Sequence, residues 1–63
     1  MTPIEFIDWR KRLGLRQNRA AVLLGLSRRT LAYYDKGQKP IPKAVSLACA
    51  AIALGVTDYP TPL

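Results

Sequence analysis

Three side chains in the middle of the chain carry hydrogen-bonding groups at a helical spacing. Arg28 and Arg29 follow Ser27 directly, and Tyr33 comes one helical turn after Arg29. A guanidinium is a planar fork of donors that matches paired acceptors, such as guanine O6 and N7 or two phosphate oxygens. Tyr33 has several open roles: packing on a thymine methyl group, bonding to a base or a phosphate, or leaning on its own helix in solvent.

The sequence lacks the combinations of residues that enzymes commonly use for catalysis. The 63 residues include no histidine and one cysteine, Cys49, so the sequence predicts no nucleophile–base pair, no zinc site and no internal disulfide. We therefore expect no enzymatic activity, no metal, no cofactor and no small-molecule ligand. Ten Lys and Arg residues against four Asp and Glu give a net charge of +6, which favours a polyanionic partner.

Two short helices must position the arginines. The sequence predicts helices over 17–24 and 28–36, with Gly25 ending the first and Ser27 capping the second. Helices joined by about three residues cross at a wide angle, so small side chains are needed where their backbones approach. The residues expected to be apolar or small on the inner side are Ala20, Ala21, Leu24, Leu26, Leu31 and Tyr34.

The stretch from Gln17 to Gly37 resembles the helix-turn-helix of the lambda-repressor/Cro-like (Xre-type) DNA-binding family, and the resemblance extends roughly from Phe6 to Val56. It implies an all-α domain of four to five helices, with residues 1–63 as one domain. It also implies a sequence-specific regulator of transcription, in first place a repressor that binds a near-palindromic operator in double-stranded DNA as a homodimer. The R-A-A-x-L-L-G-L-S and Y-Y strings are similar to those of anti-CRISPR-associated regulators of phages and mobile elements.

Alternative readings of the same residues stay open. The two helices could be an ordinary helical hairpin with a basic exterior. An antitoxin or another protein-interaction module often shares this fold and also binds DNA. A cationic membrane-surface peptide is disfavoured, because basic and apolar residues do not segregate along one long helix.

The resemblance also implies roles for individual residues. Arg28, Arg29 and Tyr33 would read bases from the major groove. The residues expected to contact phosphates are Arg16, Gln17, Arg19, Ser27, Thr30, Lys36, Lys39 and Lys43.

The N-terminal helix should begin at Thr2-Pro3 with a capping box to Glu5, and should end at Gly14. Its basic end includes Lys11 and Arg12, for which a role at the helix dipole and a role on DNA are equally open.

Two charges are oddly placed and suggest each other as partners. Arg10 falls on the apolar face that Phe6 and Leu13 define, and Asp35 lies near a helix C-terminus, where an acid is unfavourable. We expect a partly buried Arg10–Asp35 ion pair, and in the family that the chain resembles an arginine–acid pair joins the same two helices. Two unrelated exposed charges are the alternative.

The last predicted helix, 44–54, is apolar on all sides except at Ser46, which is typical of a helix buried all round. Ile41, between two prolines, should plug the core ahead of it. One side of the helix is expected to cover the other helices through Val45, Leu47, Ala48 and Ala51. The rest needs a second cover, either the tail, anchored by Tyr59 and Leu63, or a second copy of the chain. The dimer interface is expected to include Cys49, Ile52, Ala53, Val56 and Tyr59.

The sequence also suggests a location. Its N-terminus lacks the pattern of a signal peptide, and the apolar run of about 11 residues is too short to span a bilayer. We expect a cytoplasmic protein associated with the nucleoid of a bacterial or phage-infected cell, without a membrane partner.

Overall fold

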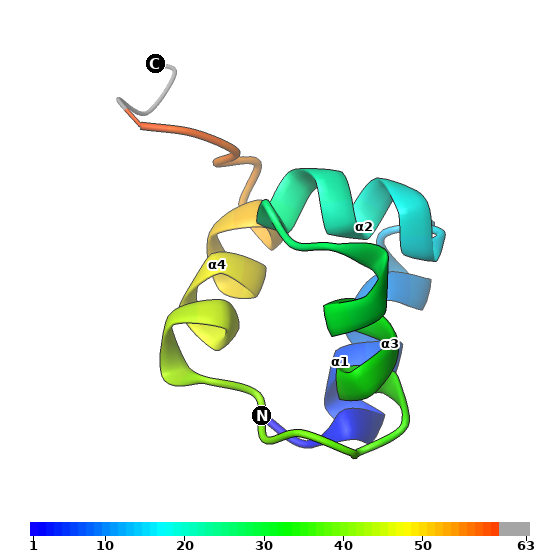
Figure 1. The fold of residues 1–63 in the computed structure, drawn as a ribbon. Coiled ribbons are helices and arrows are strands. Elements are labelled where there is room, and N and C mark those ends of the chain that lie inside the picture. The colour runs from blue at the N-terminus through cyan, green and yellow to red at the C-terminus, as the bar shows by residue number, and fades with distance from the viewer. Residues whose placement is uncertain (60–63) are drawn as a thin grey trace.

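The computed structural model describes residues 1–59, which form four helices and no strand (Figure 1). The helices are α1 (Pro3–Arg12), α2 (Gln17–Leu24), α3 (Arg28–Asp35) and α4 (Lys43–Ala53). The all-α class is therefore confirmed for this part of the chain, and the helix bounds lie within a residue or two of those expected. None of these helices has the length and apolar character needed to cross a membrane.

The start of α1 is fixed by the predicted capping box. The Thr2 hydroxyl accepts a hydrogen bond from the Glu5 backbone N–H at 3.1 Å, and the Glu5 carboxylate accepts one from the Thr2 N–H at 2.8 Å. Both bonds satisfy donors that a helix start otherwise leaves unpaired. The pKa of Glu5 is lowered, first by the hydrogen bond that its carboxylate accepts from the Thr2 backbone and then by the Thr2 side chain.

The connection between α2 and α3 has the residues that its geometry requires. Gly25 ends α2 at φ +68°, a left-handed conformation that glycine adopts at low cost. Ser27 then caps α3, because its side-chain oxygen accepts a hydrogen bond from the Thr30 N–H at 3.1 Å. Both predicted roles are confirmed, and only Gly25, Leu26 and Ser27 separate the two helices.

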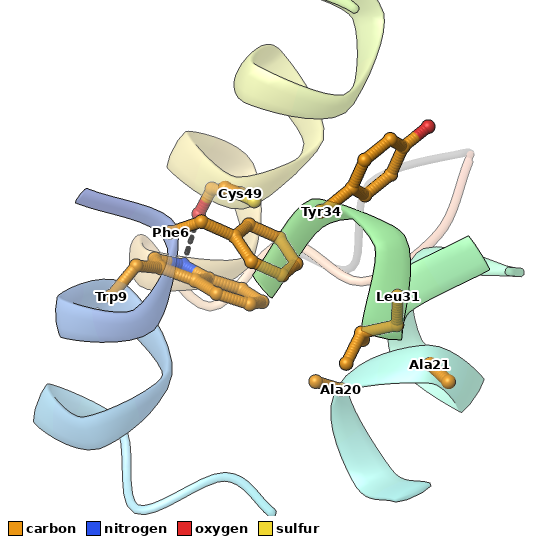
Figure 2. Close-up of a cluster of buried hydrophobic side chains, with 7 residues drawn as sticks. All are labelled: Phe6, Trp9, Ala20, Ala21, Leu31, Tyr34 and Cys49. Atoms are coloured by element: carbon orange, nitrogen blue, oxygen red, sulfur yellow. Dashed lines mark hydrogen bonds between the residues drawn. The ribbon is translucent and has the colours of Figure 1, made fainter. Parts of the chain in front are cut away.

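The core is formed by residues from all four helices (Figure 2). Phe6 stacks on Trp9 with ring centroids 5.6 Å apart and meets Tyr34 edge-to-face at 5.9 Å. The Trp9 indole N–H donates a 2.8 Å hydrogen bond to the Cys49 carbonyl of α4, so the buried polar end of this side chain is satisfied. The buried core residues are Phe6, Trp9, Ala20, Ala21, Leu31, Tyr34 and Cys49.

The orientation of α4 differs from the expected one. Cys49 was assigned to a dimer interface, but it is fully buried in the core of a single chain, and Ile52 packs against the same core. Leu47, expected to face inward, is 60% exposed. The reason is the Trp9–Cys49 hydrogen bond together with the aromatic rings of α1, which cover the side of α4 that seemed to need a partner.

The segments before and after α4 were both expected to pack against the helices, and only the first of them does so. Ile41 packs against the core as predicted. Tyr59 is 90% exposed, so it does not anchor the tail on the helices, and Leu63 lies outside the described residues. A self-contained tail cover for α4 is therefore absent from residues 1–59, and part of the apolar surface of α4 remains open to solvent.

Candidate functional site

The exposed start of α3 carries two arginines. Arg28 and Arg29 are both exposed, and within residues 1–59 neither forms an ion pair or a side-chain hydrogen bond. Leu31 and Tyr34 hold the opposite side of α3 in the core, so the helix is fixed while its arginines are free. Two guanidinium forks on a rigid support can bind paired acceptors of an outside molecule.

Ser27 and Thr30, at the start of α3, form hydrogen bonds with each other. The Ser27 oxygen accepts the Thr30 N–H, and the two hydroxyl groups lie 2.9 Å apart. Both had been expected to contact phosphates. Their hydroxyl groups retain acceptor and donor capacity, but their positions are set first by capping the helix.

Tyr33 lies on the outward side of α3 and is half-buried. The Lys39 ammonium nitrogen is 4.5 Å from the centroid of the Tyr33 ring, within the range of a cation–π contact. The turn that brings Lys39 there begins at Gly37, at φ +70°, and is closed by a 2.9 Å hydrogen bond from the Gln38 N–H to the Tyr33 carbonyl. Sequence reasoning missed this contact, although the helix-ending glycine two residues before a lysine was a usable signal.

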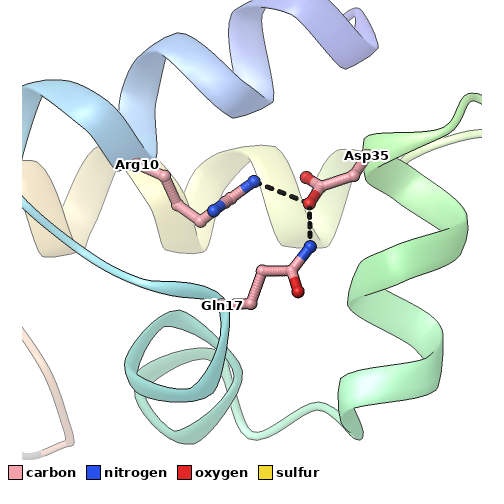
Figure 3. Close-up of polar contacts among 3 residues, drawn as sticks. All are labelled: Arg10, Gln17 and Asp35. Carbon is pink, nitrogen blue, oxygen red and sulfur yellow. Dashed lines mark hydrogen bonds and ion pairs between the residues drawn. The ribbon is translucent and has the colours of Figure 1, made fainter.

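At the other end of α3, an ion pair and a hydrogen bond to the same carboxylate connect three helices (Figure 3). Arg10 Nη2 of α1 lies 2.6 Å from Asp35 Oδ2 of α3, with side chains only 14% and 10% exposed, so the predicted pair is present and mostly buried. The same carboxylate oxygen accepts a 2.7 Å hydrogen bond from Gln17 Nε2, at the first residue of α2. Gln17, expected on a phosphate, thus has its amide nitrogen bound within the chain.

Other cations surround these helices. Arg16 directly precedes α2 and Arg19 lies in its first turn, while Lys36 follows α3 and Lys43 begins α4; all four are exposed. Because Asp35 binds Gln17, the start of α2 lies against the end of α3, and Arg16 and Lys36 belong to one region of the surface. We use the name basic surface for the exposed cations of α2, α3 and the residues that flank them, namely Arg16, Arg19, Arg28, Arg29, Lys36, Lys39 and Lys43.

The residues on the open side of α4 agree only in part with those predicted for the dimer interface. Ala53 and Tyr59 are exposed and Val56 is half-buried, as an interface would require, but Cys49 and Ile52 belong to the core. Leu47 and Leu54, which were not assigned to the interface, are 60% and 83% exposed. We call Leu47 and Leu54, which lie two turns apart on the same side of the helix, the open face of α4; Ala53 lies about a third of a turn away from them, and Tyr59 lies beyond the end of the helix.

The described residues offer no cluster of side chains that could hold a metal ion, because no group of three or more metal-ligating side chains comes together in residues 1–59. A shallow hollow lies on the outer side of α1 and is lined by Ile4, Ile7, Asp8 and Lys11, none of which belongs to the basic surface.

Comparison with known proteins adds no relative: no protein-family model, no curated protein and no solved structure matches this chain. The candidate site is therefore defined by its residues and their geometry alone.

Proposed function

We propose that this chain is a sequence-specific regulator of transcription that binds double-stranded DNA, similar to lambda-repressor/Cro-like proteins, with α2 and α3 as its helix-turn-helix. The observation that carries the proposal is the pair of free, exposed arginines at the capped start of α3. The way in which α2 and α3 are joined also supports the proposal, because only three residues separate them. The small side chains of Ala20 and Ala21 are buried in the core beside Leu31 of α3.

In the proposed complex, the N-terminal end of α3 enters the major groove. Arg28 and Arg29 then meet base edges, with guanine O6 and N7 as their preferred acceptors, and Tyr33 lies one turn further along. The remaining members of the basic surface contact phosphates, which position the protein without reading sequence. Gln17 contributes its backbone N–H at the start of α2, a favourable place for a phosphate, while its side chain stays on Asp35.

The active form in this proposal is a homodimer formed through the open face of α4. Leu47 and Leu54 are 60% and 83% exposed, and burying such apolar side chains against an identical copy is favourable. A two-fold dimer with recognition helices about 34 Å apart would match a near-palindromic operator. A dimer bound to an operator that overlaps a promoter blocks transcription, and repression is the regulatory outcome that we propose, in the cytoplasm of a bacterial or phage-infected cell.

DNA binding is tested by fluorescence anisotropy on labelled duplexes over a range of salt concentrations, followed by selection from a random duplex pool. We expect binding that weakens as salt rises, with a slope of log K against log salt of about −0.9 per phosphate neutralised, and a selected site with approximate two-fold symmetry. Single strands of the same length are the control. Absence of duplex binding at low salt, or a selected pool without a shared sequence, would contradict the proposal.

A further inference from the structure

The contact between Lys39 and Tyr33 joins two residues with different expected roles. Tyr33 lies on the outward side of α3, and Lys39 lies in the loop that follows the helix. The ammonium nitrogen is 4.5 Å from the ring centroid, so one face of the ring is covered by a positive charge. Tyr33 is half-buried, so part of its side chain remains accessible to a ligand.

The backbone holds this arrangement in place. Gly37 takes a left-handed conformation, its N–H bonds to the Tyr34 carbonyl at 3.2 Å, and the Gln38 N–H bonds to the Tyr33 carbonyl at 2.9 Å. This is the Schellman pattern of helix ends, and it turns the chain back over the last turn of the helix. These bonds fix the backbone ahead of Lys39 relative to Tyr33, so less conformational entropy is lost when the ammonium group contacts the ring.

We infer that Lys39 is a positioning residue for Tyr33 and thereby contributes to sequence discrimination as well as to affinity. This inference rests on the proposed function. The ammonium holds the ring in one orientation on α3, because the attraction of a cation to the ring face favours that rotamer over the alternatives. An ammonium has three N–H donors, so Lys39 can bind a phosphate while it stays on the ring and can link backbone position to the base that Tyr33 reads.

The inference distinguishes Lys39 from other lysines of the basic surface. Lys43 is also exposed and carries the same charge, but within residues 1–59 it forms no cation–π contact. Loss of its charge should weaken binding to all DNA sequences by one factor. Loss of the Lys39 charge should weaken binding in the same way and, in addition, reduce preference for the base pairs that Tyr33 recognises.

The experiment compares Lys39→Met, Lys39→Arg, Lys43→Met and Tyr33→Leu on the selected operator and on every single-base variant of it. At base pairs where Tyr33→Leu reduces discrimination, Lys39→Met should reduce it about two- to fivefold, the usual strength of an exposed cation–π contact. Lys39→Arg and Lys43→Met should both leave discrimination between bases unchanged. In the Tyr33→Leu background, Lys39→Met should cause no further loss of discrimination. In NMR spectra without DNA, the ring current should shift the terminal methylene protons of Lys39, and Tyr33→Leu should abolish the shift.

Two results would overturn the positioning role while leaving DNA binding intact. One is a Lys39→Met variant that loses the same factor of affinity on every sequence. The other is a Tyr33→Leu variant with unaltered base preference. If the wild-type protein binds no duplex, the proposed function itself has failed and the positioning role falls with it, even where the ring-current shift is observed.

Discussion

Arg10 and Asp35 are so little exposed, at 14% and 10%, that solvent screens their interaction weakly. Replacing Arg10 with Met leaves the Asp35 carboxylate mostly buried with only the Gln17 amide as a partner. We expect this substitution to lower the free energy of unfolding by about 3–5 kcal/mol, measured by urea titration with Trp9 fluorescence as the signal. Arg10 Nε and Asp35 Oδ1 are buried without a hydrogen-bond partner, so the pair is held by the contact between Nη2 and Oδ2.

The matched control is the second arginine–aspartate pair of α1. Arg12 Nε lies 2.7 Å from Asp8 Oδ2, but these side chains are 79% and 54% exposed. Arg12→Met should therefore change stability by only about 0.5 kcal/mol. Equal losses for the two substitutions, or a coupling near zero in a double-mutant cycle of Arg10 and Asp35, would contradict the role assigned to the buried pair.

Cys49 gives a prediction about reactivity. The Cys49 side chain is fully buried, and this burial raises the pKa of its thiol from 9.0 to about 11, so the reactive thiolate is rarer in the folded chain than in the unfolded one. A thiol reagent should modify it only when the chain opens, at a rate that rises with added urea. Because the folded pKa is the higher one, the stability that the protonated thiol contributes is fully present below about pH 9 and is lost as the pH rises towards 11.

The same thiol tests the corrected orientation of α4. If Cys49 faced a second copy, as the sequence suggested, oxidation of the native protein would cross-link two chains. The structure places it in the core of one chain, and we expect no disulfide-linked dimer on non-reducing gels under native conditions. Rapid cross-linking would mean that α4 is turned the other way.

At the scale of the elements, α4 supplies the surface on which the dimer proposal depends. Leu54 is 83% exposed on its open face, and a lysine there would place a charge in the proposed interface. We expect Leu54→Lys to convert a dimer into a monomer in sedimentation experiments. Ile4→Lys is the control, because Ile4 is 80% exposed but lies on α1, and that variant should remain dimeric. The proposed interface is wrong if both variants, or neither, dissociate.

The local signals of the helices could be predicted well from the sequence. Thr2, Gly25 and Ser27 act at helix ends through their own conformation or through a hydrogen bond to a residue three positions away, so short-range patterns are sufficient. The Arg10–Asp35 pair could also be inferred, since each charge conflicted with its own helix. Each of these signals lies within one helix face or one helix end, and the ion pair combines two of them.

The remaining features depend on how the helices sit against one another. An all-apolar helix has no polar side to mark its exposed face, so the orientation of α4 could not be read from its residues. It is set by Trp9, forty positions earlier in the chain, through the Cys49 carbonyl. The Gln17–Asp35 bond likewise depends on the meeting of two helix ends that the sequence keeps eighteen residues apart.

At the scale of the whole molecule, charge is the dominant feature. Of the ten cationic side chains, only Arg10 and Arg12 form ion pairs within residues 1–59. The others leave a strongly positive protein that attracts any polyanion, so affinity for DNA alone does not establish sequence-specific recognition. What we propose is narrower, namely that the start of α3 reads bases.

That claim is tested most directly by measuring dissociation constants of the wild-type protein, Arg28→Ala and Arg29→Ala on the selected operator and on each single-base variant. A bidentate arginine–guanine contact is worth about 1–3 kcal/mol, so each substitution should weaken specific binding roughly ten- to a hundredfold and relax the choice at one base pair per half-site. Lys36→Ala, with the same loss of charge, should weaken binding equally on all sequences. If both arginine variants lose one common factor on every sequence, including non-specific DNA, then α3 does not read the site through these residues and the account is contradicted.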